Sequence, residues 1–254
     1  LFTFLDHHGM LSVFGSPTWR TVDGGSDTYV QAVADGIRRH GGAVHLSTPV
    51  RHISENSDGT VELAISSGTQ NFDAVVVATH PHQALRLLDA PTPQQRRVLS
   101  AIEYAPKPAV LHSDISLMPR ARRAWASWNY QIHSDPSGAI DDSQVAVTYD
   151  LTRLMRLNPE HPRMLVTLGR TDLVDASTAI AEMTYEHPVY TTESVAAQAL
   201  LPDINTDSIV FAGAYHGWGF HEDGALSGAR AAERLGVAWD FARQTTVDDE
   251  RESA

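Results

Sequence analysis

The sequence predicts an α/β protein in which a parallel-sheet domain is split around a second domain with a mixed sheet. Two observations lead to this fold class. Continuous apolar runs at 72–79 and 208–215 are typical of strands that are covered on both faces. The strand candidates between these runs alternate apolar with polar residues, as in a sheet with one exposed face. A chain of this kind leaves one sheet, builds another and returns to the first.

The first part of the chain is expected to hold one helix and three strands. After an apolar opening segment and a loop at 15–21, Ser26 or Asp27 can cap a helix within 23–42, which Gly41 and Gly42 end. Strands are expected at 43–54, 60–67 and 72–79, with turns at 56–59 and 67–71.

The remainder alternates further strand and helix signals. Strands are expected at 109–114, 126–132, 144–150, 164–169 and 208–215, and helices at 94–102, 150–157, 191–200 and after Gly219. The polar and charged tail at 245–254 is expected to be disordered.

Composition excludes several classes of protein. The 254 residues carry a net charge of −12, which argues against non-specific nucleic-acid binding. There is no cysteine, so disulfides and thiolate chemistry are excluded, and a reducing, cytoplasmic location is the default expectation. No apolar run is long enough to span a bilayer, and no leader opens the chain.

The last predicted helix is built almost wholly of small residues. Gly224, Gly228 and Ala232 recur at four-residue spacing, so one face of the helix has almost no side chains. Its N-terminus presents unpaired backbone N–H groups and the positive end of the helix dipole. This pattern suits a flat, partly anionic ligand close to the backbone, and tight packing of helix on sheet is the alternative.

Four blocks of sequence resemble the C-terminal portion of the flavin-containing amine oxidase superfamily, and most closely its bacterial NAD/FAD-binding oxidoreductases. All four follow the family order over nearly the whole chain. They are PTWRTVDGGSDTYV at 17–30; TPVRHI at 48–53 with DAVVVATHP at 73–81; ASWNY at 126–130 with TYDLTRL at 148–154; and HPVYTTESVAAQ at 187–198, leading to FAGAYHGWGFHEDGALSG at 211–228.

The resemblance implies FAD as the cofactor and assigns residues to it. In this family Val50 would contact the adenine through its backbone, and the helix N-terminus after Gly219 would lie at the pyrimidine edge of the isoalloxazine ring. The implied cofactor-binding residues are Gly24, Gly25, Ser26, Val50, Ala78, Thr79, Gly213, Ala214, Gly219, Phe220, His221, Glu222 and Asp223.

Three departures from the family pattern limit which residue roles can be transferred to this chain. An acid that binds the ribityl chain is replaced by Ala214, and the family's substrate-domain lysine has a counterpart only near Lys107, beside a proline. The G-x-G-x-x-G phosphate motif is absent from the sequence. The hypothesis is a truncated or split flavoprotein without its first nucleotide-binding βαβ unit.

The resemblance also implies domain boundaries. These are a substrate-domain remnant at 1–20, parts of the FAD-binding domain at 21–79 and 206–240, a substrate domain at 80–205, and the tail at 241–254.

The remaining candidate residues are aromatic residues and histidines. Thirteen histidines invite a metal site, but no HExxH motif or acid triad accompanies them, so none is predicted. Trp128 and Tyr130 share one side of a strand and would line a substrate pocket or face the core. His216, Phe220 and Trp128 are the candidate catalytic residues.

The predicted function is FAD-dependent oxidation of a C–N or C–C bond in a small or lipid-like substrate. The alternative is a non-catalytic remnant, or a subunit that needs a partner chain bearing the missing nucleotide-binding half. A third hypothesis is isomerisation without net redox change.

Overall fold

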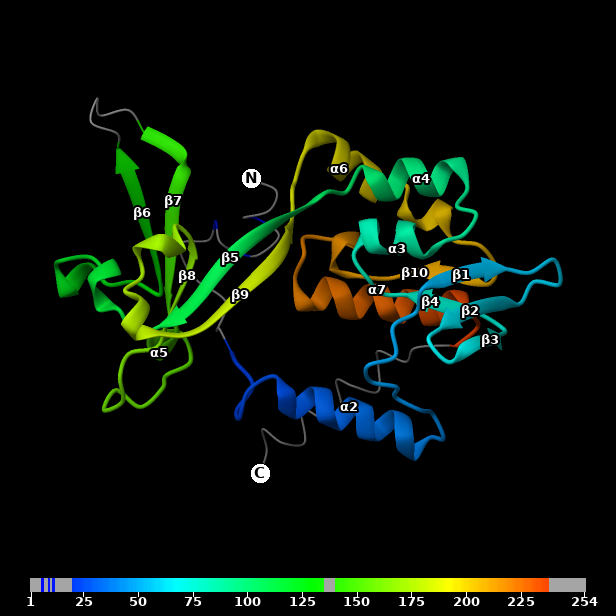
Figure 1. The fold of residues 1–254 in the computed structure, drawn as a ribbon, viewed down its shortest axis with the longest axis horizontal. Helices are drawn as coiled ribbons and strands as arrows, with labels where there is room; N and C mark the ends of the chain where they lie inside the picture. The colour runs from blue at the N-terminus through cyan, green and yellow to red at the C-terminus, as the bar shows by residue number, and fades with distance from the viewer. Residues whose placement is uncertain (1–5, 7–8, 10, 12–19, 135–139, 238–254) are drawn as a thin grey trace. The chain divides into compact units, whose positions relative to one another are not determined.

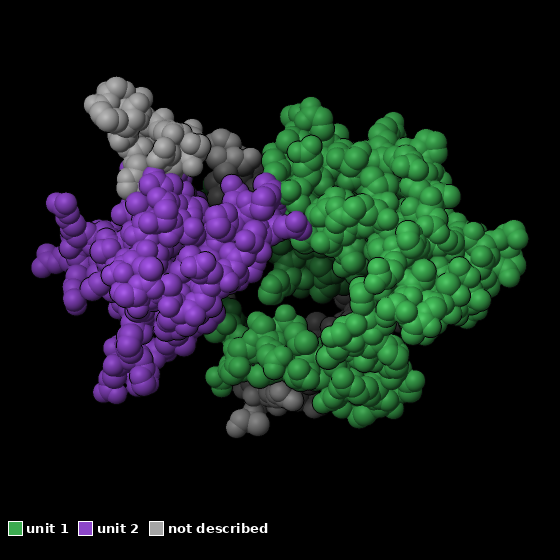
Figure 2. Space-filling model, viewed as in Figure 1, with its two compact units in different colours: residues 1–104, 188–254 green, residues 105–187 purple. Residues whose placement is uncertain are grey.

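The computed structural model describes residues 6, 9, 11, 20–134 and 140–237 (Figure 1). The chain divides into two compact units (Figure 2): unit 1 comprises Leu1–Tyr104 and Pro188–Ala254, and unit 2 comprises Ala105–His187. Most of the predicted segment 1–20 and the whole predicted tail 241–254 lie outside the described residues. Both parallel and antiparallel strand pairs are present, so the chain is a mixed α/β protein.

Unit 1 contains two small sheets. An antiparallel sheet has the order β1-β2-β3, and a parallel pair joins β10 to β4. In the parallel pair Ile209 lies opposite Val75, and Phe211 lies opposite Val77. The expected return of the chain to a parallel strand pair is therefore confirmed, and β10 is buried, whereas Val76 of β4 is exposed. The strands are β1 (His52–Glu55), β2 (Val61–Ile65), β3 (Gly68–Phe72), β4 (Val75–Val77) and β10 (Ile209–Phe211).

Five α-helices of unit 1 are described. The larger of two buried apolar clusters among the described residues contains Val61, Leu99, Leu201 and Phe211, which are almost fully buried, so strands and helices from both segments of the chain contribute to it. The helices are α2 (Asp27–Arg39), α3 (Pro81–Leu87), α4 (Pro93–Ser100), α6 (Thr192–Gln198) and α7 (His221–Arg234).

Helix α2 differs from the other helices of unit 1 because it buries none of its residues. Its apolar side chains follow the helical spacing that the sequence predicts, yet Tyr29, Val30, Val33 and Ile37 are all exposed. The apolar face of α2 therefore has no partner among the described residues.

Unit 2 is built on one five-stranded sheet with the order β6-β7-β8-β5-β9. The pairs β6–β7, β7–β8 and β8–β5 are antiparallel. The short helix α5 (Leu151–Leu154) follows β7. The strands are β5 (Tyr104–His112), β6 (Trp128–Ser134), β7 (Ile140–Asp150), β8 (Leu165–Gly169) and β9 (Ala179–Pro188).

Four elements differ from the sequence prediction. The strand expected at 43–54 is limited to β1, which begins at His52. The predicted turn at 67–71 is largely strand β3, because Thr69, Gln70 and Asn71 pair with β2 while their polar side chains remain exposed. Helix α3 and strand β9 were not predicted. A proline in the first turn and the bond from the His80 amide to Gln83 Oε1, 3.3 Å long, begin α3.

The observed boundaries between the units also differ from the predicted domain boundaries. They fall after Tyr104 and His187 rather than after residues 79 and 205. The reason is that α3, α4 and α6 contribute Ala84, Leu99 and Ala197 to the core of unit 1. Among the described residues, no helix is long and apolar enough to cross a membrane.

Candidate functional site

A cavity of about 540 Å³ lies beside strand β4 in unit 1. Val50, Ala78 and Thr79 line it, so three residues that the resemblance assigns to the cofactor lie together although they come from two segments of the chain. Ala78 and Thr79 follow the carboxyl end of a parallel strand, which is where α/β sheets bind ligands. Ile53 and Leu63 add apolar surface to the lining.

Gly24, Gly25 and Ser26 are not part of this lining. They lie just before and at the start of α2, where Gly24 and Gly25 take φ values of +79° and +88°. Ser26 occupies the N-cap position but its side chain makes no cap hydrogen bond. The structure therefore does not bring this glycine block to the cavity.

In the loop between β10 and α7, backbone amides are hydrogen-bonded to a side chain of the protein itself. The Asp223 carboxylate accepts hydrogen bonds from the amides of Trp218 (3.0 Å) and Phe220 (2.9 Å). A Cβ on Gly217 would lie 2.1 Å from Asp223 Oδ1, so glycine is needed there for this internal contact. A Cβ on Gly219 would lie 2.9 Å from the Tyr190 hydroxyl. Asp223 thus caps the start of α7.

The first turn of α7 still presents backbone N–H groups that a ligand could use. Within the described part of the chain, the amides of His221 and Glu222 have no hydrogen-bond acceptor. Both residues are exposed, and the helix dipole places partial positive charge at this end. The arrangement can accept an anionic or hydrogen-bond-accepting group.

On the small-residue face of α7, some positions pack against the preceding loop and one position, Gly228, faces open space. Ser227 is buried, and its hydroxyl accepts a 2.9 Å bond from the Gly213 amide. Gly224 has Ala214 as its neighbour, 3.8 Å from a built Cβ. A Cβ on Gly228, in contrast, would meet nothing within 4 Å. One part of the stripe therefore serves packing of the β10–α7 loop, and another part is free to approach a ligand.

Two buried polar atoms in this loop lack hydrogen-bond partners. They are the Tyr215 hydroxyl and His216 Nε2. Burial raises the pKa of Tyr215, with a smaller contribution from Tyr104. Burial, followed by the nearby charge of Arg230, lowers the pKa of His216 to about 4. His216 is therefore neutral at pH 7, and the loop holds polar groups that the described protein leaves unsatisfied.

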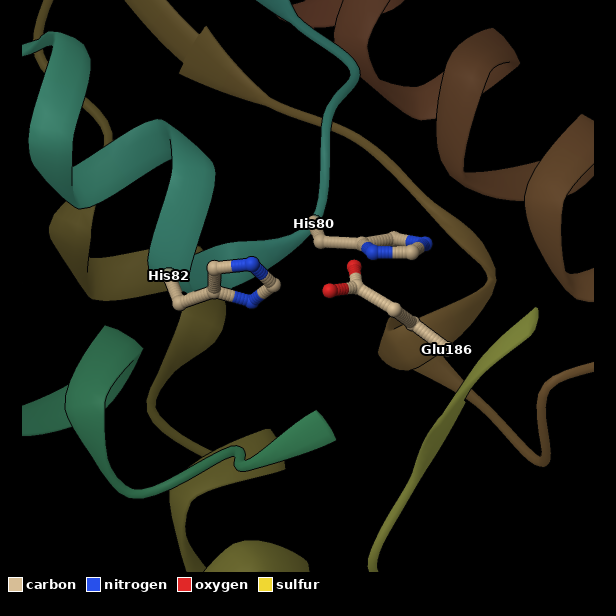
Figure 3. A group of neighbouring side chains, drawn as sticks. All are labelled: His80, His82 and Glu186. Carbon is tan, nitrogen blue, oxygen red and sulfur yellow. The ribbon is translucent and has the colours of Figure 1, made fainter. Parts of the chain in front are cut away.

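Two histidines begin α3 in the same unit (Figure 3). The His80 ring stacks on Tyr104 with centroids 4.1 Å apart, and the His80 and His82 centroids are 5.8 Å apart. Glu186, the third side chain in Figure 3, belongs to unit 2. Within unit 1 the two histidines form an aromatic cluster with Tyr104.

The sheet of unit 2 has one apolar face that is partly open. Trp128, Tyr130 and Ile132 of β6 point to the same side and are 52%, 70% and 56% exposed. The strand register places these partners on that side as well: Tyr149, Val147 and Val145 of β7; Val166 and Leu168 of β8; and Leu111 and Ala109 of β5. Because Trp128 and Tyr130 are exposed, the interpretation of this pair as core-facing is wrong.

Lys107 lies on the same face. Side chains alternate along a strand, so Lys107 of β5 shares the side of Ala109 and Leu111. Lys107 is exposed and lies within the strand despite the prolines on either side of it. The open face therefore combines an apolar surface with one basic group at its margin.

The opposite face of this sheet is buried and holds a network of polar side chains among apolar ones such as Val110 and Leu165. Thr167 is fully buried, and its hydroxyl oxygen lies 2.8 Å from His112 Nε2 and 2.8 Å from the Thr148 hydroxyl. Asn129 Nδ2 donates to the Thr148 carbonyl. Sequence reasoning missed this network, although the alternation of Thr148 and Thr167 with apolar residues could have indicated two faces of unlike polarity.

The chain was also compared with known proteins. A sequence model of the family described as flavin containing amine oxidoreductase matches residues 2–112. The resemblance inferred from the sequence is thereby confirmed, and FAD is the cofactor that the family implies for this chain. No curated protein sequence matches it.

Solved structures of flavin amine oxidases share the fold. Cyclohexylamine oxidase from Brevibacterium oxydans IH-35A matches with a TM-score of 0.55 and 15% identity, over 83% of this chain and 52% of that one. Wild-type putrescine oxidase bound to putrescine matches with a TM-score of 0.53 and 15% identity, over 84% of this chain and 53% of that one. The chain spans about half the length of these structures.

The residues present fit part of an FAD molecule. The cavity at Val50, Ala78 and Thr79 offers an apolar wall, and Gly228 leaves a side-chain-free surface on α7. The orphaned His216 Nε2 is a polar atom that a ligand could satisfy. The pyrophosphate cradle of glycines has no counterpart in the sequence. The cavity lining and the surface at Gly228 are therefore compatible with flat, apolar parts of the cofactor.

Proposed function

We propose that this chain is the second part of an FAD-dependent oxidoreductase that oxidises a C–N or C–C bond. The observation that carries this proposal is the cavity beside β4, which gathers Val50, Ala78 and Thr79. In the family motif these positions adjoin the dinucleotide. In this proposal unit 1 is the partial FAD-binding domain and unit 2 the substrate domain inserted into it.

The chain would hold FAD through backbone and apolar contacts. Val50, Ala78 and Thr79 would receive the adenine end, and the free amides of His221 and Glu222 would receive the polar edge of the ring system. Bound FAD supplies the capacity to accept a hydride. Fixed amide dipoles stabilise negative charge without reorganising, so the α7 N-terminus would favour the reduced cofactor.

The proposed substrate is apolar or lipid-like. The open face of the unit 2 sheet presents Trp128, Tyr130 and Ile132, and an apolar face of this kind binds apolar groups by removing their surface from water. Trp128 is accordingly assigned to substrate contact. Phe220, which is 39% exposed at the start of α7, is assigned to the wall of the ring pocket.

His216 is assigned to proton handling in unit 1. Its imidazole is neutral at pH 7 because burial lowers its pKa to about 4, and its Nε2 has no partner among the described residues. A neutral imidazole can hold or relay a proton at a ring nitrogen. Gly213, Ala214 and Gly219 are assigned only to the shape of the loop, and Asp223 to its capping.

Flavin titration tests the proposal. We expect the purified 254-residue chain to bind FAD weakly, and to bind it at one equivalent when it is joined to, or mixed with, a βαβ segment that carries G-x-G-x-x-G. Ala78→Phe would fill the cavity and abolish that binding, because Ala78 is exposed and lines it. Ala196→Phe, on an exposed position of α6, is the matched control. Equal binding by both variants would contradict the site.

A second candidate is a subunit that acts only with a partner chain. Two exposed apolar features of unit 1 favour it. Among the described residues the parallel sheet consists of β4 and β10, although parallel sheets are normally larger and covered on both faces. Val76 of β4 is 39% exposed, and the apolar face of α2 has no partner. A nucleotide-binding βαβ unit could add strands to this sheet and cover α2.

Two measurements distinguish the candidates. If the chain co-purifies with a G-x-G-x-x-G polypeptide and is monomeric and colourless without it, the subunit hypothesis holds. If the reconstituted flavoprotein turns over substrate only with an electron acceptor, it is an oxidoreductase. Turnover without an acceptor would instead support isomerisation.

A further inference from the structure

Unit 2 contains a second hollow, separate from the open sheet face and unlike it in chemistry. Its volume is about 620 Å³, and its lining includes Arg122, Arg153, Arg156 and Arg163 around Trp125. Asp150 is the acidic residue of the lining. Four guanidinium groups and one carboxylate leave three positive charges around one cavity, in a chain whose net charge is −12.

Pairing within the cavity is incomplete. The Asp150 side chain is buried and forms an ion pair with Arg163. Asp150 also accepts a hydrogen bond from the Arg153 amide, which leaves little capacity for a second guanidinium. Among the described residues, no carboxylate lies within ion-pair distance of Arg122, Arg153 or Arg156.

Trp125 contacts three of the four arginines, and of these three only Arg163 also pairs with an acid in the part of the chain that the structure describes. The guanidinium carbons of Arg122 and Arg163 lie 5.4 Å and 4.9 Å from the Trp125 ring centroid. Arg153 Nη1 donates to the Trp125 carbonyl at 2.9 Å. Trp125 is itself fixed by a 2.6 Å bond from its Nε1 to the Pro119 carbonyl. Stacking and backbone contacts position the cations while leaving N–H donors for a ligand.

We propose that this arginine pocket, formed by Arg122, Trp125, Arg153, Arg156 and Arg163, binds the phosphate group of a small molecule or lipid. An arginine fork can satisfy both oxygens of a carboxylate, so a monocarboxylate would use only one of the three uncompensated cations. A phosphate dianion presents three terminal oxygens and nearly two charges, which matches the charge and donor count of the pocket.

Calorimetric titration of the 254-residue chain at low salt tests the pocket. The probes are inorganic phosphate, pyrophosphate and acetate. We expect one equivalent of pyrophosphate to bind, phosphate to bind more weakly, and acetate to bind at least tenfold more weakly than phosphate. Affinity should fall steeply with added salt, because charges at a partly exposed site are screened.

Matched variants locate the binding. Arg122→Gln with Arg156→Gln removes two exposed, unpaired cations and is expected to weaken pyrophosphate binding at least tenfold, and each single change about threefold. Arg96→Gln on an exposed position of α4 should leave the affinity unchanged. Pyrophosphate should also raise the melting temperature of the wild type and of R96Q but not of the double variant.

Two further probes distinguish a soluble phosphate ester from a lipid headgroup as the ligand of the pocket. Glycerol phosphate that binds as tightly as pyrophosphate, without binding of vesicles made from phosphatidylglycerol and phosphatidylcholine, would indicate a soluble phosphate ester. Vesicle binding that is lost in the double variant would indicate a lipid headgroup. Acetate binding equal to phosphate binding, an unchanged double variant, or no binding of any probe would each overturn the proposal.

Discussion

The two faces of the unit 2 sheet differ in their exposed and buried side chains: one buries a polar network among apolar residues, and the other leaves aromatic side chains exposed. The buried face carries Thr148, Thr167 and His112, all almost fully buried, whereas the face with Trp128 and Tyr130 is open. The buried polar groups are bonded to one another, so their burial costs little. The open apolar groups have no such compensation. The difference teaches that a buried polar network can be satisfied within unit 2, whereas aromatic side chains of the other face stay exposed in the described part of the chain.

The largest expected effect comes from breaking the buried face. Thr167→Val keeps the shape of the side chain but removes the hydroxyl that joins His112 to Thr148, so two buried polar groups lose a partner. We expect a loss of about 2–4 kcal/mol in the free energy of unfolding, measured with urea. Val166→Thr, one residue away on the open face, is the control and should cost well under half as much.

The second effect is a pH dependence of the buried face. Burial is the largest influence on His112 and lowers its pKa below the usual 6.5, while Asp114 opposes this. The unfolded chain therefore takes up a proton at a pH where the folded chain does not. The contribution of His112 to the free energy of unfolding is fully present above pH 6.5. It falls as the pH drops below 6.5, by at most about 1.4 kcal/mol per pH unit for this one group.

Urea unfolding between pH 7 and 4 measures this slope. His112→Gln should reduce it even if the variant is less stable overall. His216 contributes in the same direction because its pKa is also lowered, to about 4, so the His112→Gln and His216→Gln effects on the slope should add. A slope that is identical in wild type and both variants would show that neither buried histidine is held neutral.

A smaller effect is expected on the open face. Trp128→Ala removes a ring that is 52% exposed and touches Tyr149 only edge-on, so about 1 kcal/mol is expected, against about 3–5 kcal/mol for a fully buried Trp. Binding of an apolar fluorescent probe should fall much more than stability does. Trp128→Phe should preserve probe binding. A loss above 3 kcal/mol would mean that this face supports the fold itself.

The smallest effect is expected at the most exposed aromatic residue. Tyr130→Ser changes a side chain that is 70% exposed, and the free energy of unfolding should change by less than about 0.5 kcal/mol. Self-association at high concentration should decrease, because the exposed apolar patch becomes smaller. Sedimentation of wild type and variant side by side measures this. Greater self-association of the variant would rule out the patch as its cause.

Periodicity in the sequence predicted much of the fold. The apolar runs at 72–79 and 208–215 contain the two strands of the parallel pair, and the spacing of apolar residues placed α2 correctly. Strand β3 was missed because an exposed edge strand of Gly, Thr, Gln and Asn has the composition of a turn. Its strand conformation comes from pairing with β2, which is a tertiary contact and leaves no local signal.

The candidate site was predictable only where a family motif carried it. Val50, Ala78 and Thr79 do lie together, but Asp223 turns its carboxylate to the preceding amides, which no spacing rule indicates. The arginine pocket could not be predicted at all. Arg122 and Arg163 are distant in sequence and meet only through Trp125, so the pocket depends on how loops are placed.

Hydrogen exchange of the α2 amides can report when another surface covers the apolar face of this helix. A helix of 13 residues without a buried side chain has little beyond its own hydrogen bonds to stabilise it. Its amides should therefore exchange with deuterated solvent almost as fast as those of a free peptide, while those of β4 and β10 exchange slowly. Whatever covers Tyr29, Val33 and Ile37 would slow that exchange, so its arrival could be timed residue by residue.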